Sequence, residues 1–267
     1  MVRDEEIEIP VDDQRIAGTL VSPATLAPGI LFVHGWGVDR DTYLPRAREV
    51  AALGCVCLAF DLRGHAATED QRDSVTREDN MRDVVAAYDA LAKHPVVDPS
   101  AMAVVGSSYG GYLAAVLTAL RPVQFLALRV PALYKDEDWA LPKQQLREYG
   151  LDAFRRGPVS PDENRALGAC AAFEGDALVV ASEHDDTIPR PVIANYVAAF
   201  RKVRSLTYRV IAGADHALSE QPWQQAYTSA LLNWATEMVL SAREGGEKSE
   251  VQTSLRPSPG QEPLRPA

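Results

Sequence analysis

The chain has 267 residues, of which 46% are hydrophobic and 24% charged, and its formal net charge is -10. A chain of this length can bury a sizeable core as one large domain. The excess of acidic residues argues against a nucleic-acid partner, which would need a basic surface. The 3 cysteines do not make a disulfide framework and indicate a reducing compartment. No signal-peptide core or bilayer-spanning run is evident, so we expect a soluble cytoplasmic protein with no membrane partner.

The first part of the chain alternates apolar and polar residues. Glu5 to Val11 and Arg15 to Val21 do so on either side of a short polar turn, which predicts an antiparallel hairpin with one solvated face. The next apolar run, Gly29 to Val33, is continuous. Such a run is typical of a central strand that is buried on both faces.

Strand-like and helix-like segments alternate along most of the remaining chain. Strands that alternate with helices imply right-handed crossovers and a mostly parallel sheet with helices on both sides. The segments are, in chain order, a helix at Tyr43 to Leu53, a strand at Cys55 to Phe60, a helix at Arg77 to Lys93, a strand at Ala101 to Val105, a helix from Tyr112 to Leu120, a strand at Val123 to Val130, a strand at Ala177 to Ala181, a helix at Arg190 to Arg201, a strand at Leu206 to Ile211 and a helix at Pro222 to Leu240.

Two segments depart from this alternation. Residues 131–175 hold aromatic residues among many charges and lack a regular pattern, so they form either a surface excursion with short helices or a small cap that shapes a substrate site. From residue 242 the chain is rich in Gly, Glu, Ser and Pro, which predicts a disordered tail over residues 242–267. We therefore expect one domain over residues 1–241, followed by that tail.

A GxSxG pattern lies between the strand that ends near Val105 and the helix that follows it. Its central residue, Ser108, needs a sharp turn with a sparsely populated, positive φ, and strain of that kind persists where function needs it. Gly106 and Gly110 have no Cβ and allow the strand and the helix to approach closely. Ser108 is therefore the candidate nucleophile, and its neighbour Ser107 points away from the turn. The pattern resembles the nucleophile elbow of the α/β-hydrolase family.

The resemblance covers roughly Ile7 to Leu240. It implies the α/β-hydrolase fold, an eight-stranded, mostly parallel sheet with helices on both faces and a small insertion after the sixth strand. The serine-esterase, dienelactone-hydrolase-like and prolyl-peptidase-like branches are all similar to this chain. A dienelactone-type hydrolase normally carries Cys at the nucleophile position, where this chain has Ser108.

A serine hydroxyl needs a base within hydrogen-bond reach, and that base needs an acid that fixes its tautomer. The family order is serine, acid, histidine. His216, just past the last predicted strand, fits the base. Two aspartates compete for the acid, and the family spacing of four residues before a proline selects Asp185 over Asp186, because Pro189 follows at that distance.

Backbone N–H groups are expected to hold the negative charge that develops on the substrate oxygen. One donor is the amide of Tyr109, at the start of the helix after Ser108. The segment His34-Gly35-Trp36-Gly37 resembles the HGxx oxyanion loop of the family, which implies the amide of Trp36 as the second donor.

The segment Asp61 to His65 resembles the family turn DxRGxG, with Ala66 in place of the last glycine. The resemblance implies that Asp61 and Arg63 form a structural ion pair. His65 either lines the pocket or is a satisfied loop histidine, and we expect the second.

These features predict a serine hydrolase that cleaves a small-molecule carboxylic ester through an acyl-enzyme and requires no metal or organic cofactor. The catalytic residues would be Ser108, Asp185 and His216, and the oxyanion hole would use Trp36 and Tyr109. The same machinery serves thioesters, amides and peptides, and the fold also occurs as a non-catalytic binding module. These alternatives stay open, as does a homodimer.

Overall fold

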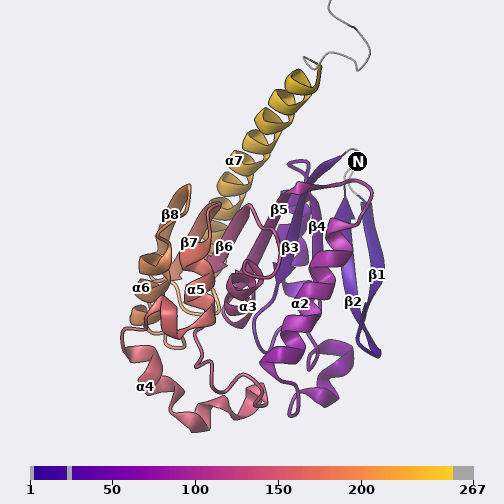
Figure 1. The fold of residues 1–267 in the computed structure, drawn as a ribbon. Helices are drawn as coiled ribbons and strands as arrows, with labels where there is room; N and C mark the ends of the chain where they lie inside the picture. Colours follow the sequence, from indigo (N-terminus) through magenta and orange to yellow (C-terminus); the bar gives the residue numbers. More distant parts are fainter. Residues whose placement is uncertain (1–2, 23–25, 255–267) are drawn as a thin grey trace, which may run out of the picture.

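The computed structural model describes the backbone of residues 3–22 and 26–254 and contains one eight-stranded sheet between two layers of helices (Figure 1). The strand order is β1-β2-β4-β3-β5-β6-β7-β8. β1 and β2 pair antiparallel, as do β2 and β4, and the other neighbours are parallel. This is the α/β-hydrolase fold, with the insertion after β6, as expected.

Most element boundaries differ from the predicted ones by a few residues. The largest differences are at the end of α7, described below, and at β5, which is extended at both ends. The strands and α-helices are β1 Arg3–Val11, β2 Gln14–Ser22, β3 Ala27–Val33, α1 Leu44–Ala51, β4 Val56–Phe60, α2 Arg77–Ala92, β5 Val97–Ser107, α3 Tyr109–Leu117, β6 Phe125–Arg129, α4 Leu151–Arg156, α5 Arg165–Ala172, β7 Asp176–Ser182, α6 Arg190–Ala199, β8 Ser205–Ile211 and α7 Gln221–Ser254.

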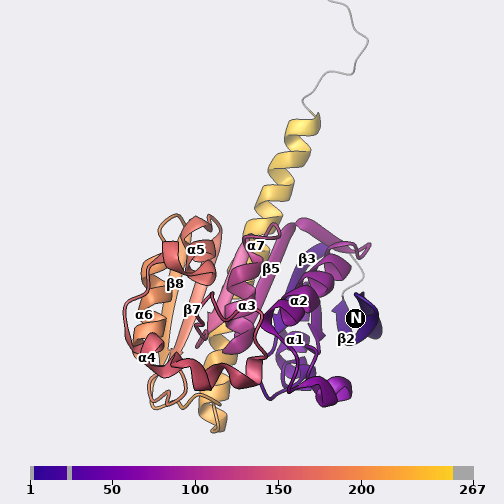
Figure 2. The same ribbon diagram turned by 60° about the horizontal axis from the view of Figure 1, so that its bottom comes forward.

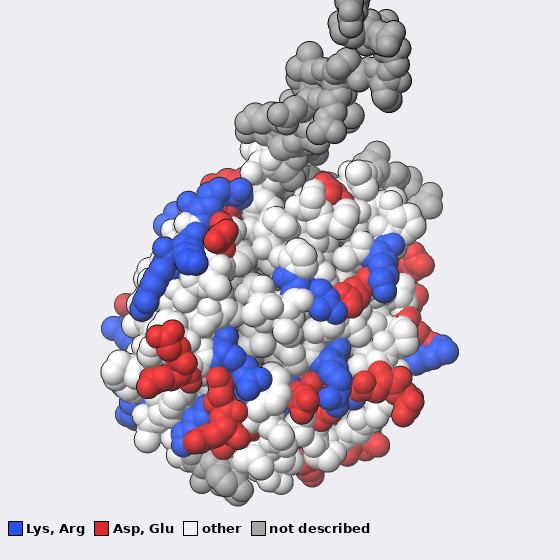
Figure 3. Space-filling model, viewed as in Figure 1, with Lys and Arg blue, Asp and Glu red and all other residues white. Residues whose placement is uncertain are grey.

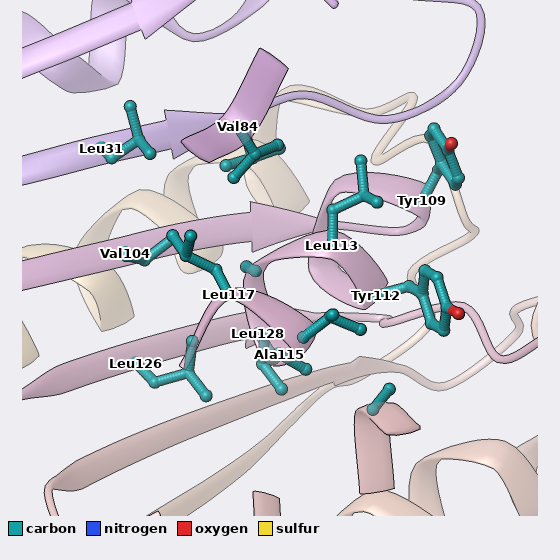
Figure 4. Packing of buried hydrophobic residues seen from close by; sticks show 14 of the residues in the cluster. Leu31, Val84, Val104, Tyr109, Tyr112, Leu113, Ala115, Leu117, Leu126 and Leu128 are labelled. Carbon is teal, nitrogen blue, oxygen red and sulfur yellow. The ribbon is translucent and has the colours of Figure 1, made fainter. Parts of the chain in front are cut away.

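Helices pack on both faces of the sheet, so the central strands are buried on two sides. One hydrophobic core lies under α2, α3, α5 and α6, and the other lies under α1 and α7. All seven residues of β3 are buried, which explains its unbroken apolar sequence. Figure 4 shows the packing on the first face, where Leu113 and Leu117 of α3 belong to the same buried cluster as Val104, Leu126 and Leu128 of the sheet.

The last helix, α7, is longer than predicted. It was expected to end at Leu240 and runs to Ser254, and Figure 1 shows its final turns projecting beyond the body of the protein. Residues such as Ala, Arg, Glu and Lys favour helix even where no core is available to pack against. The predicted tail therefore begins as helix, and residues 255–267 lie outside the described residues. None of the helices among the described residues is long and apolar enough to cross a membrane.

The parallel strands deliver their following loops to one end of the sheet. The loops after β3, β5, β7 and β8 carry the predicted site residues, and the insertion after β6 belongs to the same end. Figure 2 turns this end toward the viewer and shows the segment around α4 spread across it. The fold therefore brings together segments that lie far apart in the chain, from the loop after β3 to the loop after β8.

Candidate active site

Ser108 lies on a tight turn between β5 and α3. Its φ of 53° and ψ of -117° are sparsely populated for a residue with a side chain. A Cβ on Gly106 would lie 2.4 Å from the carbonyl oxygen of Gly110, and a Cβ on Gly110 would lie 2.2 Å from the carbonyl oxygen of Val33. Both positions require glycine, so the GxSxG pattern is a consequence of how closely strand and helix approach.

The side chains of Ser108, His216 and Asp185 form a continuous hydrogen-bonded chain. His216 Nε2 lies 3.1 Å from Ser108 Oγ, and His216 Nδ1 lies 2.8 Å from Asp185 Oδ2. Nδ1–H donates to the carboxylate, which leaves Nε2 to accept from the serine hydroxyl. The side chain of Asp185 is 6% exposed and that of His216 is 22% exposed. This geometry allows the imidazole to take a proton from the serine while the carboxylate fixes its orientation.

Asp185 is the aspartate that contacts His216. Its Oδ1 also accepts from the backbone N–H groups of Thr187 at 2.9 Å and Ile188 at 2.7 Å. Asp186 is exposed and accepts from the Thr187 hydroxyl. The turn after β7 thus aims the first of the two carboxylates inward and the second toward solvent.

The loops that carry Asp185 and His216 are joined to each other and to the sheet. The backbone N–H of His184 donates to the carbonyl of Ala214 at 2.8 Å, which continues the pairing of β7 with β8. Arg129 at the end of β6 is buried, and both of its terminal nitrogens donate to the carbonyl oxygen of His216, at 2.9 and 2.5 Å. Sequence reasoning missed Arg129, although a charged residue inside an apolar strand was a usable signal.

The loop after β3 passes close to the serine. A Cβ on Gly35 would lie 3.4 Å from the carbonyl oxygen of Ser107 and 3.5 Å from Ser108 Cβ. Tyr109 is the first residue of α3, where a backbone N–H has no acceptor within the helix. The structure therefore brings the Trp36 loop and the start of α3 together beside Ser108.

Two buried histidines connect this loop to the loop after β4. His65 Nε2 accepts from the backbone N–H of Gly37 at 3.1 Å, and His34 Nε2 accepts from that of Leu62 at 3.0 Å. His34 Nδ1–H donates to the carbonyl of Gly35. Burial lowers the pKa of His34 to about 4 and lowers the pKa of His65 as well. Both rings are therefore neutral near pH 7, as acceptance at Nε2 requires.

The expected ion pair between Asp61 and Arg63 is wrong. Arg63 is buried and pairs with Asp83 of α2, with 2.5 Å between Nε and Oδ1. Asp61 accepts instead from the backbone N–H of Arg40 at 2.9 Å. The sequence places Asp83 in the middle of a helix, and only the packing of that helix on the sheet shows that its carboxylate faces inward.

Asn80 of α2 extends this buried network to the nucleophile elbow. Its Nδ2 donates to Asp83 Oδ2 at 3.1 Å, and its Oδ1 accepts from the Tyr109 hydroxyl at 2.9 Å. The side chain of the residue that follows Ser108 is therefore fixed by hydrogen bonds to α2. Such networks rigidify a site when every member has a partner.

A cavity of about 380 Å³ opens beside Ser108 and His216. Half of the residues that line the cavity belong to the insertion after β6, and a role of this segment as a small cap stays a prediction. The residues of the insertion that line the cavity are Tyr134, Lys143, Gln144, Leu146, Leu151 and Arg155. The remaining lining residues are Trp36, Ser108, Tyr109, Thr187, Ile188 and His216.

The described residues contain no group of three or more His, Cys, Asp or Glu side chains arranged to hold a metal ion. The cysteines are buried, and Cys55 and Cys57 belong to the core under α1 and α7. Burial raises the pKa of the Cys57 thiol well above its usual range, so it packs as a small apolar side chain.

Comparison with known proteins agrees with this architecture. Over 109 residues the chain is 30% identical to the thiohydrolase aneE of Aspergillus aculeatus. The aligned stretch covers 40% of this chain and 34% of that relative. The chain thus matches about a third of the length of that curated relative. A bacterial heroin esterase superposes with a TM-score of 0.65 at 22% identity, covering 89% of this chain and 84% of its own.

Two further structures have the same fold. The dienelactone hydrolase from Anabaena variabilis superposes with a TM-score of 0.60 at 22% identity, over 87% of this chain and 96% of its own. A dipeptidyl aminopeptidase IV homologue from Bacteroides ovatus gives 0.69 at 16% identity, over 89% of this chain and 36% of its own. Residues 45–241 match the model of the prolyl oligopeptidase family. The chain therefore belongs to the prolyl oligopeptidase family, within the α/β-hydrolase fold.

Proposed function

We propose that this protein is a serine hydrolase that cleaves carboxylic esters through an acyl-enzyme. The observation that supports this most directly is the hydrogen-bonded chain from Ser108 through His216 to Asp185, at the edge of a cavity large enough for a small molecule. The strained conformation of Ser108 supports the same conclusion, because strain of this kind collects at functional sites.

In the proposed reaction, Ser108 Oγ attacks the acyl carbonyl while His216 Nε2 takes its proton. The amides of Trp36 and Tyr109 stabilise the negative charge on the former carbonyl oxygen. His216 then gives the proton to the departing alcohol, which leaves the acyl group on Ser108. Water attacks this ester with His216 again as the base, and the acid is released. Asp185 keeps the imidazole in the required tautomer and stabilises its protonated form.

Cleavage of peptides or thioesters is the second candidate. The match to the prolyl oligopeptidase family favours peptides, and the partial match to a protein named a thiohydrolase favours thioesters. The same nucleophile, base and oxyanion donors would serve ester, thioester and peptide bonds. Only a comparison of rates with the three kinds of substrate can show which bond the protein prefers. A non-catalytic binding role is the alternative of another class.

The proposal is tested with p-nitrophenyl acetate, butyrate and hexanoate on the unmodified chain, on Ser108→Ala and on Ser107→Ala as the neighbouring control. We expect Ser108→Ala to lower kcat by at least about 1,000-fold, whereas Ser107→Ala retains most of the activity. The kcat/KM values for a butyryl thioester and a prolyl p-nitroanilide then rank the three bond types. Equal rates for the unmodified chain and Ser108→Ala would contradict the proposal and favour a binding role.

A further inference from the structure

Three cationic side chains surround the ring of Tyr134 at the wall of the cavity. The distances to its centroid are 4.9 Å from Arg155 Cζ, 5.2 Å from Arg77 Cζ and 5.5 Å from Lys143 Nζ. Arg77 comes from α2 and the other two from the insertion after β6. Lys143 and Arg155 line the same cavity as Ser108.

Arg77 contributes positive charge that no carboxylate in the described part of the chain pairs with. It is fully buried, its Nη1 donates to the Tyr112 hydroxyl at 3.4 Å, and its Nε and Nη2 have no hydrogen-bond partner. Asp136, the carboxylate that acts on Tyr112, is itself paired with Arg165 at 3.2 Å. The guanidinium also lies over the rings of Tyr112, Tyr134 and Trp139, so aromatic faces stabilise this charge without neutralising it.

Lys143 and Arg155 are held in place before any ligand arrives. Arg155 is 7% exposed and its Nε donates to the carbonyl of Leu133 at 2.9 Å. The backbone N–H of Lys143 donates to the carbonyl of Val75 at 2.9 Å, and its ammonium lies 4.6 Å from the centre of the Trp36 ring. These are the only charged side chains among the described lining residues apart from the titratable His216, and both are cations.

The described charged side chains closest to the Tyr134 ring are therefore all cations. Burial alone would raise the pKa of the Tyr134 phenol, and the three neighbouring cations, with a hydrogen bond from Arg155, lower it instead. An anion placed in the cavity would experience the same field in surroundings of low dielectric constant, where charge interactions are strong. Figure 3 shows acidic and basic side chains interspersed over the face that carries α2 and α5. A grouping of cations alone, as at the cavity wall, is therefore not a general feature of the surface seen there.

We propose that the substrate carries a carboxylate, which Lys143 and Arg155 bind while Ser108 attacks the scissile carbonyl. The inference rests on the proposed function and names its substrate class, half-esters of dicarboxylic acids or esters of hydroxy acids. A fixed guanidinium next to an ammonium suits a carboxylate, because it combines directed N–H donors with a point charge. The carboxylate belongs either to the acyl part or to the alcohol part, and two pairs of substrates distinguish these.

The first pair tests the acyl part and consists of p-nitrophenyl hydrogen adipate and p-nitrophenyl hexanoate, which have equal chain length. The second pair tests the alcohol part and consists of 4-carboxyphenyl butyrate and 4-(methoxycarbonyl)phenyl butyrate. Rates with Ser108→Ala are subtracted as background. We expect kcat/KM for the anionic member of one pair to exceed that of its neutral match by about tenfold or more, a preference that falls with added salt. No preference in either pair overturns the proposal.

Lys143→Met is the test of the site itself, with Lys202→Met as a control that removes a charge from the loop between α6 and β8. We expect Lys143→Met to reduce the anionic-over-neutral preference by about fivefold or more, mainly through KM of the anionic ester. Lys202→Met should leave the preference as it is. An equal reduction by both variants would show a general charge effect and would overturn the assignment to Lys143.

Binding separates this proposal from the proposed function. Monomethyl adipate, with its carboxylate in the acyl part, and 4-carboxyphenyl butyrate, with its carboxylate in the alcohol part, are each titrated calorimetrically into Ser108→Ala and into Ser108→Ala with Lys143→Met. Weaker binding to the double variant supports the carboxylate site even if the unmodified chain hydrolyses no ester. Equal binding of both ligands to the two variants, or no binding of either ligand, overturns the site, whatever activity Ser108 has.

Discussion

The two sides of Ser108 are built differently. On one side, buried polar groups fix the loops after β3 and β4. His34 and His65, which connect these loops, are each 1% exposed. On the other side, the loops after β7 and β8 carry Asp185 and His216, whose side chains are 6% and 22% exposed. The groups that must keep one protonation state are buried, and the group proposed to exchange protons stays in contact with water.

This difference predicts two kinds of mutational effect. Changes to Asp185 or His216 that keep the shape of the side chain should cost activity and little stability, because an isosteric side chain can keep the hydrogen bonds to the neighbouring backbone. Changes on the buried side should cost stability, because they leave polar groups without partners in the interior. The predictions below start with the largest expected effect.

Asp185→Asn should lower kcat for a p-nitrophenyl ester by about 10,000-fold, because an amide N–H facing His216 Nδ1 forces the proton onto Nε2 and removes the base. Asp186→Asn changes the neighbouring aspartate and is the matched control. It should keep most of the activity, because the Asp186 side chain is exposed and its hydrogen bond is with the Thr187 hydroxyl, not with His216. Similar losses in the two variants would refute the assignment of Asp185. Both variants should melt close to the unmodified protein.

Arg63→Met should lower the free energy of unfolding by about 3–5 kcal/mol, because it leaves the buried carboxylate of Asp83 unpaired. Arg15→Met also removes an arginine at 2.5 Å from a carboxylate, but that pair with Glu8 is exposed, with 73% and 67% of the two side chains accessible. Its loss should cost at most about 1 kcal/mol. Denaturant titration of the three proteins measures both values, and equal costs would mean that burial does not set the difference.

The buried histidine should make stability depend on pH. His34 has a pKa of about 4 in the folded protein, against about 6.5 when unfolded. Between those values the unfolded chain binds a proton that the folded protein does not, so stability falls as pH falls through this window, by roughly 3 kcal/mol, and levels off below it. His34→Asn lacks this contribution, so the stability difference between the two proteins should shrink from pH 7 to pH 4. Parallel curves from denaturant titrations would contradict the pKa shift.

His65→Ala should lower kcat for a p-nitrophenyl ester by about tenfold. The N–H of Gly37 loses its acceptor, and the Trp36 ring loses its edge-on contact with the His65 ring, whose centroid lies 4.7 Å from its own. His65→Gln supplies an acceptor oxygen and should recover most of that loss. KM should change less than kcat, since the loop is proposed to act on the charge of the transition state. A loss in which both variants are equal, or in which only KM changes, would show that the contact to Gly37 does not matter.

Much of the fold was predictable because its signals are local. The unbroken apolar run of β3 reflects burial on both faces, and the glycines around Ser108 reflect a turn that leaves no room for a Cβ. The order of serine, aspartate and histidine at strand ends was likewise visible in the chain. The end of α7 was not predictable in this way, because the residues beyond 241 continue the helix although their composition indicated no packed core there.

The sequence by itself determined the alternation of strands and helices, the strained turn and the residues that could act at it, because each depends on neighbours within a few positions. Only the tertiary structure decided that Arg63 pairs with Asp83, and that Arg77 meets Lys143 and Arg155 around one tyrosine. Those contacts join residues from separate elements. Their geometry follows from how helices and loops pack on the sheet, for which no local pattern in the chain exists.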